Sequence, residues 1–455
     1  MMDYKVNALL ENDGFLCACG KEHFGQLSDC IIGENALVSL PDICRKHRVT
    51  RPFVLCDRET YAAAGEAVCK ILSSAEIPYT LHIIRRTHPA PDEKIVGEAF
   101  MFCPNGTAET GGADGVIAVG GGVINDTGKI VAAAKGIPDI YVATAPSMDG
   151  YASASSSMER EGLKVSLSSK CPDAVIGDAA VLANAPVHMI RSGIGDMLAK
   201  YVSVAEWQIA HILVGDEYCP VVADMVNHSL AEVRACAADA VRGDDTAVCR
   251  AAVCRLAEAL VVSGLAMNYA GISRPASGME HYISHILDMR ALEFGTPSDL
   301  HGIQCGIGTL MTLRAYEPLR GYAPDREKAL AHAAQFDADA WNDHLRTVLG
   351  HGADAMIAGE RKEGKYDREK HAARLETILS RWEDIQHIIA ALPPSAELEQ
   401  FMRSIGHPTT AEEIGLSRQD MREAFLCAKD IRDKYVLGRL LWDLGILDET
   451  ADNIV

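Results

Sequence analysis

The 455-residue sequence contains no apolar run that approaches the roughly 20 residues needed to cross a bilayer. The best candidate, the segment from residue 259 to 272, is shorter and is interrupted by Ser263, Gly264, Asn268 and Gly271. The N-terminal segment has no basic stretch followed by an apolar one, so we expect no secretion signal. The sequence therefore predicts a protein without a membrane span.

Positive charge is also scarce, because 43 lysines and arginines face 63 aspartates and glutamates and leave a net charge of −20. A nucleic-acid backbone needs a basic surface, so this balance argues against a nucleic-acid partner while allowing a local site for one small phosphate. The 48% of apolar residues argues against disorder. The fourteen cysteines are scattered, and several lie in apolar stretches, which is typical of buried thiols in a reducing cytoplasm rather than of disulfides.

The first part of the chain alternates short apolar runs with segments of helical periodicity. The predicted strands are Arg51–Cys56, Pro78–Ile84, Gly115–Val119 and Asp139–Thr144, and the predicted helices between them include Tyr61–Leu72 and Asn125–Lys135. This alternation predicts βαβ units and a parallel sheet. We expect an α/β domain over residues 1–183.

From about Asn184 the strand-like runs disappear and long apolar-periodic segments replace them. The predicted helices are Gly195–Ile212, Pro220–Val241, Thr246–Ala270, Glu280–Met289 and Ile303–Tyr316. Loops are expected at Gly359–Lys365 and Pro393–Pro394, and a last helix over Arg418–Leu444 should end at Gly445, a residue suited to a left-handed C-cap. We expect an all-helical domain over residues 184–455.

The strongest local motif is GVIAVGGGVINDTGK at residues 115–129, where a buried strand ends in three glycines and a helix follows. Without Cβ atoms the backbone turns sharply, and the start of the helix offers N–H groups to a phosphate. Such a turn lies at the carboxyl edge of a parallel sheet, where ligands bind. The motif matches neither GxGxxG nor the GKS or GKT ending of a P-loop, and a tight turn without a ligand is the alternative.

Two other strand ends carry polar residues. Asp57 directly follows the first apolar run, where a carboxylate can accept hydrogen bonds from a ribose, and a helix N-cap is the alternative. The segment Thr144–Ser153, TAPSMDGYAS, combines hydroxyls, one carboxylate and a glycine after the fourth run. It suits a pyrophosphate or a polyol, although hydroxyl-rich loops also occur for turn formation alone.

A metal-like constellation lies in the helical part. Asp196 opens an apolar helix, His281 and His285 are four residues apart and share one helix face, and His301 precedes a glycine. Two imidazoles and a carboxylate suit a transition ion with one position open for substrate. Apolar neighbours such as Ile283 strengthen this interpretation, because uncoordinated polar groups there would be costly.

A second group of metal-ligand residue types lies near the N-terminus, in Cys17-Ala-Cys-Gly-Lys-Glu-His23. Cysteine and histidine at short spacing are typical of zinc sites. The sequence has no second pair at ribbon or finger spacing, so we interpret this segment as structural.

Taken together, these segments resemble the iron-containing alcohol dehydrogenase and dehydroquinate synthase-like superfamily, and most closely its sn-glycerol-1-phosphate dehydrogenase branch. The motifs that carry the resemblance occur in family order over about residues 50 to 310: GGGVINDTGK, VATAPSMDGYAS, GIGDMLAKYVS, SRPASGMEHYISH and HGIQCG. The C-terminal segments GHPTTAEEIGLS and RDKYVLGRLL are similar to that branch as well. The resemblance implies a Rossmann-like nucleotide domain, a helical metal and substrate domain, and an active site in the cleft between them.

The resemblance also implies residue roles. Cofactor contacts fall on Asp57, Gly121, Gly122, Asp126, Lys129, Thr144, Ser147 and Ser153. The metal ligands fall on Asp196, His281 and His301, whereas spacing alone favours His281 with His285. Asp149 and His285 face the substrate as candidate catalytic residues, and Arg274 is our candidate for the substrate phosphate, with helix capping or a pair with Glu280 as alternatives.

The implied reaction is the reduction of dihydroxyacetone phosphate to sn-glycerol 1-phosphate by NADH or NADPH, with one zinc, nickel or iron ion polarising the carbonyl. The implied setting is phospholipid biosynthesis in the cytoplasm, and we expect a homodimer. A polyol dehydrogenase acting on unphosphorylated glycerol and a dehydroquinate synthase-like lyase are the enzymatic alternatives, and a sensor built on an inactive scaffold is the non-enzymatic one.

Overall fold

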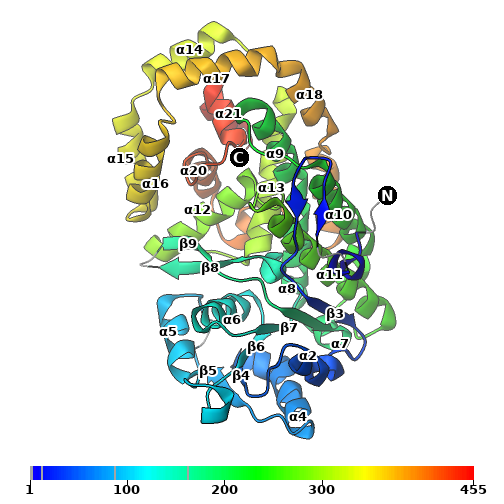
Figure 1. The fold of residues 1–455 in the computed structure, drawn as a ribbon. Coiled ribbons are helices and arrows are strands. Elements are labelled where there is room, and N and C mark those ends of the chain that lie inside the picture. The colour runs from blue at the N-terminus through cyan, green and yellow to red at the C-terminus, as the bar shows by residue number, and fades with distance from the viewer. Residues whose placement is uncertain (1–3, 12–13, 87–88, 161–162, 455) are drawn as a thin grey trace. The chain divides into compact units, whose positions relative to one another are not determined.

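The computed structural model describes residues 4–11, 14–86, 89–160 and 163–454, whose helices and strands are labelled in Figure 1. The chain forms two compact units. Unit 1 comprises Met1–Met197 and Val221–Ile272, and unit 2 comprises Leu198–Pro220 and Ser273–Val455. The predicted boundary after residue 183 lies inside unit 1, because the later helix α11 (Ala247–Ala270) packs against β3 (Asp29–Gly33) and α7 (Ala179–Ala183) of that unit.

Unit 1 contains a six-stranded sheet in the order β3-β10-β7-β6-β4-β5, and every pair of neighbours is parallel. The strands are β3 (Asp29–Gly33), β4 (Pro52–Asp57), β5 (Thr80–Ile84), β6 (Gly115–Gly120), β7 (Asp139–Ala143) and β10 (Ala174–Asp178). Strands β4, β6, β7 and β10 are buried along their whole length, as expected for a parallel sheet covered on both faces. The α/β prediction is confirmed.

Unit 1 also contains the helices α2 (Leu40–Lys46), α4 (Glu66–Ser74), α5 (Glu93–Phe102), α6 (Gly122–Lys135), α7 (Ala179–Ala183), α8 (Val187–Leu198), α10 (Pro220–Ala240) and α11. Of these, α5, α6, α7 and α11 contact strands of the sheet directly. One face packs α2 and α4 against the central strands in a continuous apolar core that includes Leu40, Val68, Ile117 and Val142. Helix α6 lies against β6 and begins where that strand ends.

Six of the described strands were not expected from the sequence, and two of them, β1 (Phe15–Leu16) and β2 (Glu22–His23), form a short N-terminal hairpin. Strands β3 and β10 join the main sheet, and β8 (Ser155–Arg160) pairs with β9 (Leu163–Ser168) in an antiparallel ribbon. Strand β3 is only partly buried and β8 alternates polar residues with a single methionine, so neither has a marked apolar signal.

Unit 2 consists of helices and connecting loops, with no strand among its described residues. Its helices are α9 (Lys200–Val214), α12 (Met279–Phe294), α13 (His301–Tyr316), α14 (Arg326–Gln335), α15 (Ala338–Leu349), α16 (Gly352–Glu363), α17 (Arg368–Ser380), α18 (Trp382–Ala391), α19 (Ser395–Ser404), α20 (Arg418–Ala428), α21 (Leu437–Asp443) and α22 (Leu447–Ile454). Helices α12 and α13 pack against each other along their length. Among the described residues, no helix is long and apolar enough to span a membrane.

The single helix predicted over Arg418–Leu444 is wrong, because α20 and α21 are separated by the segment 429–436. Lys429 in this segment is buried with its ammonium 3.3 Å from the centre of the Trp341 ring. Asp430 accepts hydrogen bonds from the Trp341 indole and the Tyr366 hydroxyl. These tertiary contacts outweigh the local helical periodicity.

The loop predicted over Gly359–Lys365 is also mostly wrong. Helix α16 runs through Gly359 to Glu363 and ends at Gly364, whose φ of 63° is the left-handed C-cap conformation. The loop at Pro393–Pro394 is confirmed between α18 and α19.

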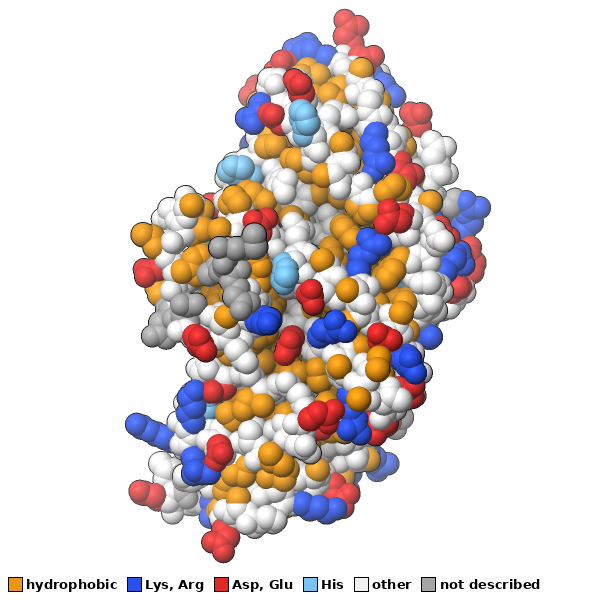
Figure 2. All heavy atoms as spheres, turned by 90° about the vertical axis from the view of Figure 1, so that its right-hand side faces the viewer, with side chains coloured by type: hydrophobic (Ala, Val, Ile, Leu, Met, Phe, Trp, Pro, Cys, Tyr) orange, Lys and Arg blue, Asp and Glu red, His pale blue; other side chains and the backbone are white. Residues whose placement is uncertain are grey.

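On the face drawn in Figure 2, lysines and arginines are interspersed with aspartates and glutamates among the described residues. They do not gather into one broad patch there. This agrees with the net charge of −20 and offers a nucleic-acid backbone no extended cationic surface on that face.

Asp139 is a charged residue type placed inside the core of unit 1. It begins β7, is fully buried, and neither carboxylate oxygen has a hydrogen-bond partner among the described residues. Burial outweighs the attraction of Lys170 and Lys129 and raises the pKa of this carboxyl to about 7. The protonated acid is therefore the stable form inside the fold over much of the acidic range.

We predict that Asp139→Asn raises the melting temperature at about pH 8 and has little effect at about pH 4. The unfolded carboxyl ionises near 3.8 and the folded one near 7, so the wild type loses stability as the pH rises between these values. The loss is on the order of 4 kcal/mol at most. Thermal denaturation of both proteins across this range, followed by circular dichroism, measures it, and a pH-independent difference would contradict the assignment.

Candidate functional site

The carboxyl ends of β4 and β6 form the point where the strand order of the sheet reverses. Strand β5 lies on one side of β4, whereas β6 and β7 follow on the other. Ligands of open α/β sheets bind outside the carboxyl ends of strands at such a point. Here the sequence places Asp57 at the end of β4 and the three glycines at the end of β6.

Helix α6 begins at this edge without a side-chain cap on its first N–H groups. A Cβ on Gly120 would lie 2.5 Å from the Cβ of Ile124, so glycine is required for the strand to meet the helix. A Cβ on Gly121 would meet only the end of a methionine side chain, at 3.6 Å. The bare backbone and the uncapped helix start fit the phosphates of a dinucleotide.

Asp57 caps the start of a helix, the alternative role considered for it in the sequence analysis. Its Oδ1 accepts the Thr60 amide at 2.8 Å, and the Thr60 hydroxyl accepts the Asp57 amide at 3.0 Å. This reciprocal arrangement is a capping box at the start of α3 (Arg58–Thr60). A contact from Asp57 to a ribose stays a prediction.

Lys129 is fully buried on α6 and holds the loop that follows β7. Its ammonium forms an ion pair with Asp126 at 2.9 Å and donates to the carbonyl oxygens of Gly150 at 3.1 Å and Ser155 at 2.6 Å. The Ser153 hydroxyl is 3.4 Å away. The structure thus brings together three residues predicted to contact the cofactor, and it satisfies the buried charge with protein oxygens.

Helix α8 holds the same loop from another side. The Asp149 amide donates to Oδ2 of the fully buried Asp196 at 2.9 Å, and the Ser192 hydroxyl donates to the Ser147 carbonyl at 2.9 Å. A Cβ on Gly193 would lie 2.0 Å from the carbonyl oxygen of Pro146. Only glycine therefore allows the helix and the loop to approach this closely.

Helix α11 supplies the third set of contacts. The Ser263 hydroxyl donates to Oδ2 of Asp149 at 2.8 Å, and the Asn268 amide donates to the Ala152 carbonyl. At the start of the loop, the Thr144 amide donates to the Gly120 carbonyl at 3.1 Å. The loop is thereby fixed beside the glycine turn, so that the predicted cofactor residues of both motifs lie at one edge of unit 1.

In unit 2, two of the predicted metal ligands lie together on neighbouring helices. The rings of His281 on α12 and His301 on α13 have centroids 5.0 Å apart. Cys305, one turn after His301, has its Sγ 3.5 Å from Nε2 of that histidine. The donor atoms of these three residues all lie within 4.8 Å of one another, which suits a transition ion.

The orientation of His281 is set by a buried carboxylate. Nδ1 of His281 lies 2.8 Å from Oε1 of Glu280, which also accepts the Gly278 amide at 2.7 Å. A proton on Nδ1 directed at this carboxylate leaves the lone pair on Nε2, the arrangement of a metal-binding histidine. Burial and the neighbouring Glu280 raise the pKa of the Glu206 carboxyl, so this pair of carboxylates does not carry two full negative charges at neutral pH.

Cys305 was quoted in the HGIQCG motif without a role, although its i,i+4 spacing from His301 places both on one helix face. Burial alone would raise the pKa of its thiol, but the charges and hydrogen bonds of His281 and His301 outweigh burial and lower that pKa below its ordinary value. Cys305 therefore belongs to the group of donors around His301.

Two predicted substrate residues also lie in unit 2. The His285 ring stacks on His301 with centroids 5.6 Å apart, so it adjoins the same group. Arg274 is buried, forms an ion pair with Asp216, and donates to the Tyr435 carbonyl at 2.8 Å. These contacts, rather than the pair with Glu280 weighed from the sequence, occupy the guanidinium.

Comparison with known proteins gives a consistent result. The model of a family described as iron-containing alcohol dehydrogenase matches residues 31–186. A protein of Bacillus velezensis named glycerol-1-phosphate dehydrogenase, NAD(P)+, is 30% identical, with 94% of this chain and 92% of the relative covered. A Bacillus licheniformis protein of the same name is 29% identical and covers 95% and 93%.

Among solved structures, a probable glycerol dehydrogenase from Sinorhizobium meliloti is similar to this chain with a TM-score of 0.61. The alignment covers 94% of this chain and 99% of the other, at 18% identity. This similarity confirms the fold expected from the sequence, an α/β part followed by a helical part.

We predict that Gly193→Ala weakens NADH binding about tenfold or more, because the added methyl displaces the loop after β7 at a cost of roughly 1–3 kcal/mol. Gly97→Ala on α5 is the matched control, since its Cβ would meet nothing within 4 Å. Titration of NADH fluorescence with both variants measures the effect. Unchanged affinity in Gly193→Ala would show that the loop does not contribute to the cofactor site.

Proposed function

The chain belongs to the glycerol-1-phosphate dehydrogenase family, and on this basis we propose that it reduces dihydroxyacetone phosphate to sn-glycerol 1-phosphate with NADH or NADPH. The observation that carries the proposal is that the chain has one site suited to a dinucleotide and another suited to a metal ion. Unit 1 has a glycine turn and an uncapped helix start suited to a dinucleotide, and unit 2 has a group of imidazoles suited to a metal.

We propose that the dinucleotide binds at the glycine turn of unit 1. The N–H groups at the start of α6 would hold its pyrophosphate. Thr144 and Ser147, in the loop after β7, would be further polar contacts. The carboxylate of Asp57 favours NADH, because it would repel the extra phosphate of NADPH.

For the metal we propose Asp196, His281 and His301 as ligands. His281 fits because Glu280 fixes its tautomer, and His301 fits because its ring lies beside that of His281. Bound there, a divalent ion of zinc, nickel or iron would polarise the carbonyl while the nicotinamide supplies hydride. Cys305 makes a thiolate-accepting metal such as zinc the first choice.

The remaining polar residues have roles that follow from their surroundings. We propose that His285, stacked on His301, supplies the proton taken up by the product oxygen, since imidazole titrates near neutral pH. We propose that Asp149 orients a substrate hydroxyl. Its carboxylate accepts a hydrogen bond from Ser263, and its amide donates to Asp196. Arg274 remains our candidate for the substrate phosphate, a role that would require it to share its guanidinium with Asp216.

The proposed setting is phospholipid biosynthesis in the cytoplasm, where all fourteen cysteines would remain as the thiols seen in the structure. We propose a homodimer as the working oligomer. Light scattering of the purified chain tests this state directly.

We predict that the metal-free enzyme does not oxidise NADH with dihydroxyacetone phosphate and that activity returns on addition of zinc, nickel or iron(II). Dihydroxyacetone, which lacks the phosphate, should react at least about tenfold less efficiently, since one lost charged contact costs 1.4 kcal/mol or more. Absorbance of NADH measures both substrates. Preference for dihydroxyacetone would indicate a polyol dehydrogenase, and turnover without net NADH consumption would indicate a lyase.

We also predict that Glu280→Gln lowers metal affinity about 10- to 100-fold, because the amide holds the Nδ1 proton of His281 less strongly than the carboxylate. Glu293→Gln on the same helix is the matched control, since Glu293 pairs with His351 instead. Competition with a chelating indicator measures both affinities. Equal affinity in the two variants would contradict the assignment of His281 as a ligand.

A further inference from the structure

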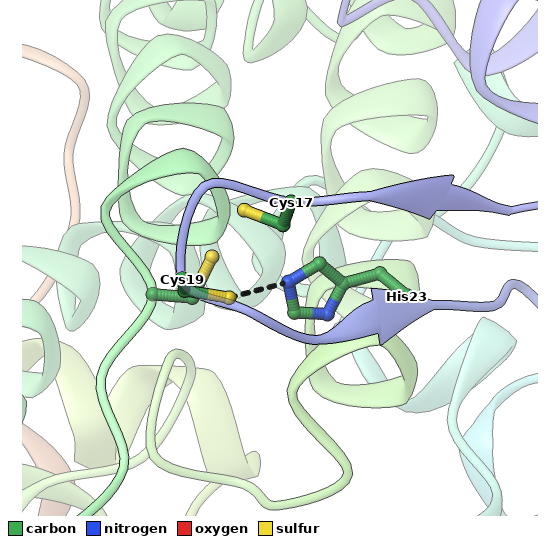
Figure 3. Close-up of side chains that lie close together, drawn as sticks. Cys17, Cys19 and His23 are labelled. Atoms are coloured by element: carbon green, nitrogen blue, oxygen red, sulfur yellow. Dashed lines mark hydrogen bonds between the residues drawn. The ribbon is translucent and has the colours of Figure 1, made fainter.

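The N-terminal hairpin of unit 1 brings together two thiols and an imidazole that the proposed reaction does not use. Strands β1 (Phe15–Leu16) and β2 (Glu22–His23) pair antiparallel, and the turn between them carries Cys17 and Cys19. Figure 3 shows both cysteines on this turn and His23 on the second strand, with a hydrogen bond from Cys19 to the imidazole.

The turn holds the two cysteines in a tight, glycine-dependent geometry. The Cys17 amide donates to the Lys21 carbonyl at 2.8 Å, and the Gly20 amide donates to the Cys17 carbonyl at 2.9 Å. Gly20 has a φ of 85°, the left-handed region that favours glycine. Within this turn the Sγ atoms of Cys17 and Cys19 lie within 4.8 Å of each other.

The imidazole of His23 is oriented by a contact outside the hairpin. Its Nδ1 donates to the Tyr269 carbonyl of α11 at 2.6 Å, which leaves the lone pair on Nε2. Nε2 lies 3.3 Å from Sγ of Cys19, and the donor atoms of Cys17, Cys19 and His23 all lie within 4.8 Å of one another. In a tetrahedral zinc site, neighbouring sulfur and nitrogen donors are about 3.5–3.8 Å apart.

The burial of this group matches a structural metal site. Cys17 is 6% exposed and His23 is 2% exposed, although the hairpin has only two residues in each strand. So short a ribbon has little stability of its own and requires a tertiary or covalent anchor. Its apolar contacts are modest: Phe15 packs on the rings of His23 and Tyr269.

We propose that Cys17, Cys19 and His23 bind a zinc ion that fixes the N-terminal hairpin to the end of α11. On binding, Zn²⁺ forms two bonds to sulfur and one to Nε2, and the two thiol protons pass to solvent. A ligand from outside the hairpin completes the tetrahedron. This site differs from the one proposed on α12 and α13 in position and in having two thiolates.

The zinc would also steady the cofactor edge of unit 1. The Tyr269 carbonyl accepts the His23 hydrogen bond, and Tyr269 directly follows Asn268. The side-chain amide of Asn268 donates to the Ala152 carbonyl in the loop after β7. A displacement of the end of α11 would therefore shift Asn268 and, through its hydrogen bond, the loop after β7.

The test is metal analysis of the full-length protein loaded with zinc under reducing conditions. We expect the double variant Cys17→Ser/Cys19→Ser to bind about one zinc ion fewer per chain than the wild type. Cys30→Ser on β3 is the matched control and should bind as much as the wild type. His281→Ala separates the two sites, because it should release the other metal and leave the hairpin zinc. A folded double variant with unchanged zinc content would overturn the proposal.

A second measurement leaves the three hairpin residues unchanged. X-ray absorption of the zinc-loaded Cys305→Ser protein, which lacks the thiol beside His301, should show sulfur neighbours at about 2.3 Å. Zinc surrounded only by nitrogen and oxygen would overturn the proposal.

Discussion

The hydrogen bond from the Asp149 amide to the buried carboxylate of Asp196 is the contact on which the site in unit 1 depends. It joins the loop after β7 to α8, and the same loop is tied to α6 by Lys129 and to α11 by Ser263. These donors and acceptors are buried, where an unsatisfied polar group is expensive. The loop therefore has one conformation that satisfies all three helices, and that conformation fixes the predicted cofactor residues beside the glycine turn.

In unit 2, hydrogen bonds orient the two imidazoles in a similar way. Glu280 orients His281, Ser284 lies 3.1 Å from Nδ1 of His301, and Gln304 donates to Ser284 in turn. Each imidazole thus has one nitrogen directed at a fixed protein partner, which selects the other for metal.

The sequence predicted the central strands and the glycine turn because β4, β6 and β7 are continuous apolar runs bounded by turn residues. It did not predict β8 or the break at residues 429–436. The polar β8 forms through its ribbon partner β9, and the break depends on Trp341 and Tyr366, which are far away in sequence. Both outcomes depend on tertiary contacts that local periodicity does not encode.

The site residues divide in the same way. Spacing alone paired His281 with His285, whereas the family resemblance selected His281 with His301, a pair that depends on how α12 packs on α13. The capping task of Asp57 was visible as an alternative from its position before a helix. The role of Gly193 was not visible, because a close approach between two elements leaves no local pattern in either one. Cys305 did have a local signal, its i,i+4 spacing from His301 on one helix, but the sequence analysis gave it no role.

The configuration of the reduced product tests the central claim most directly. Glycerol phosphate formed from dihydroxyacetone phosphate and NADH should be isolated and assayed for its configuration at the second carbon with enantiomer-specific enzymes. The account predicts sn-glycerol 1-phosphate, and formation of sn-glycerol 3-phosphate or of unphosphorylated glycerol would contradict it.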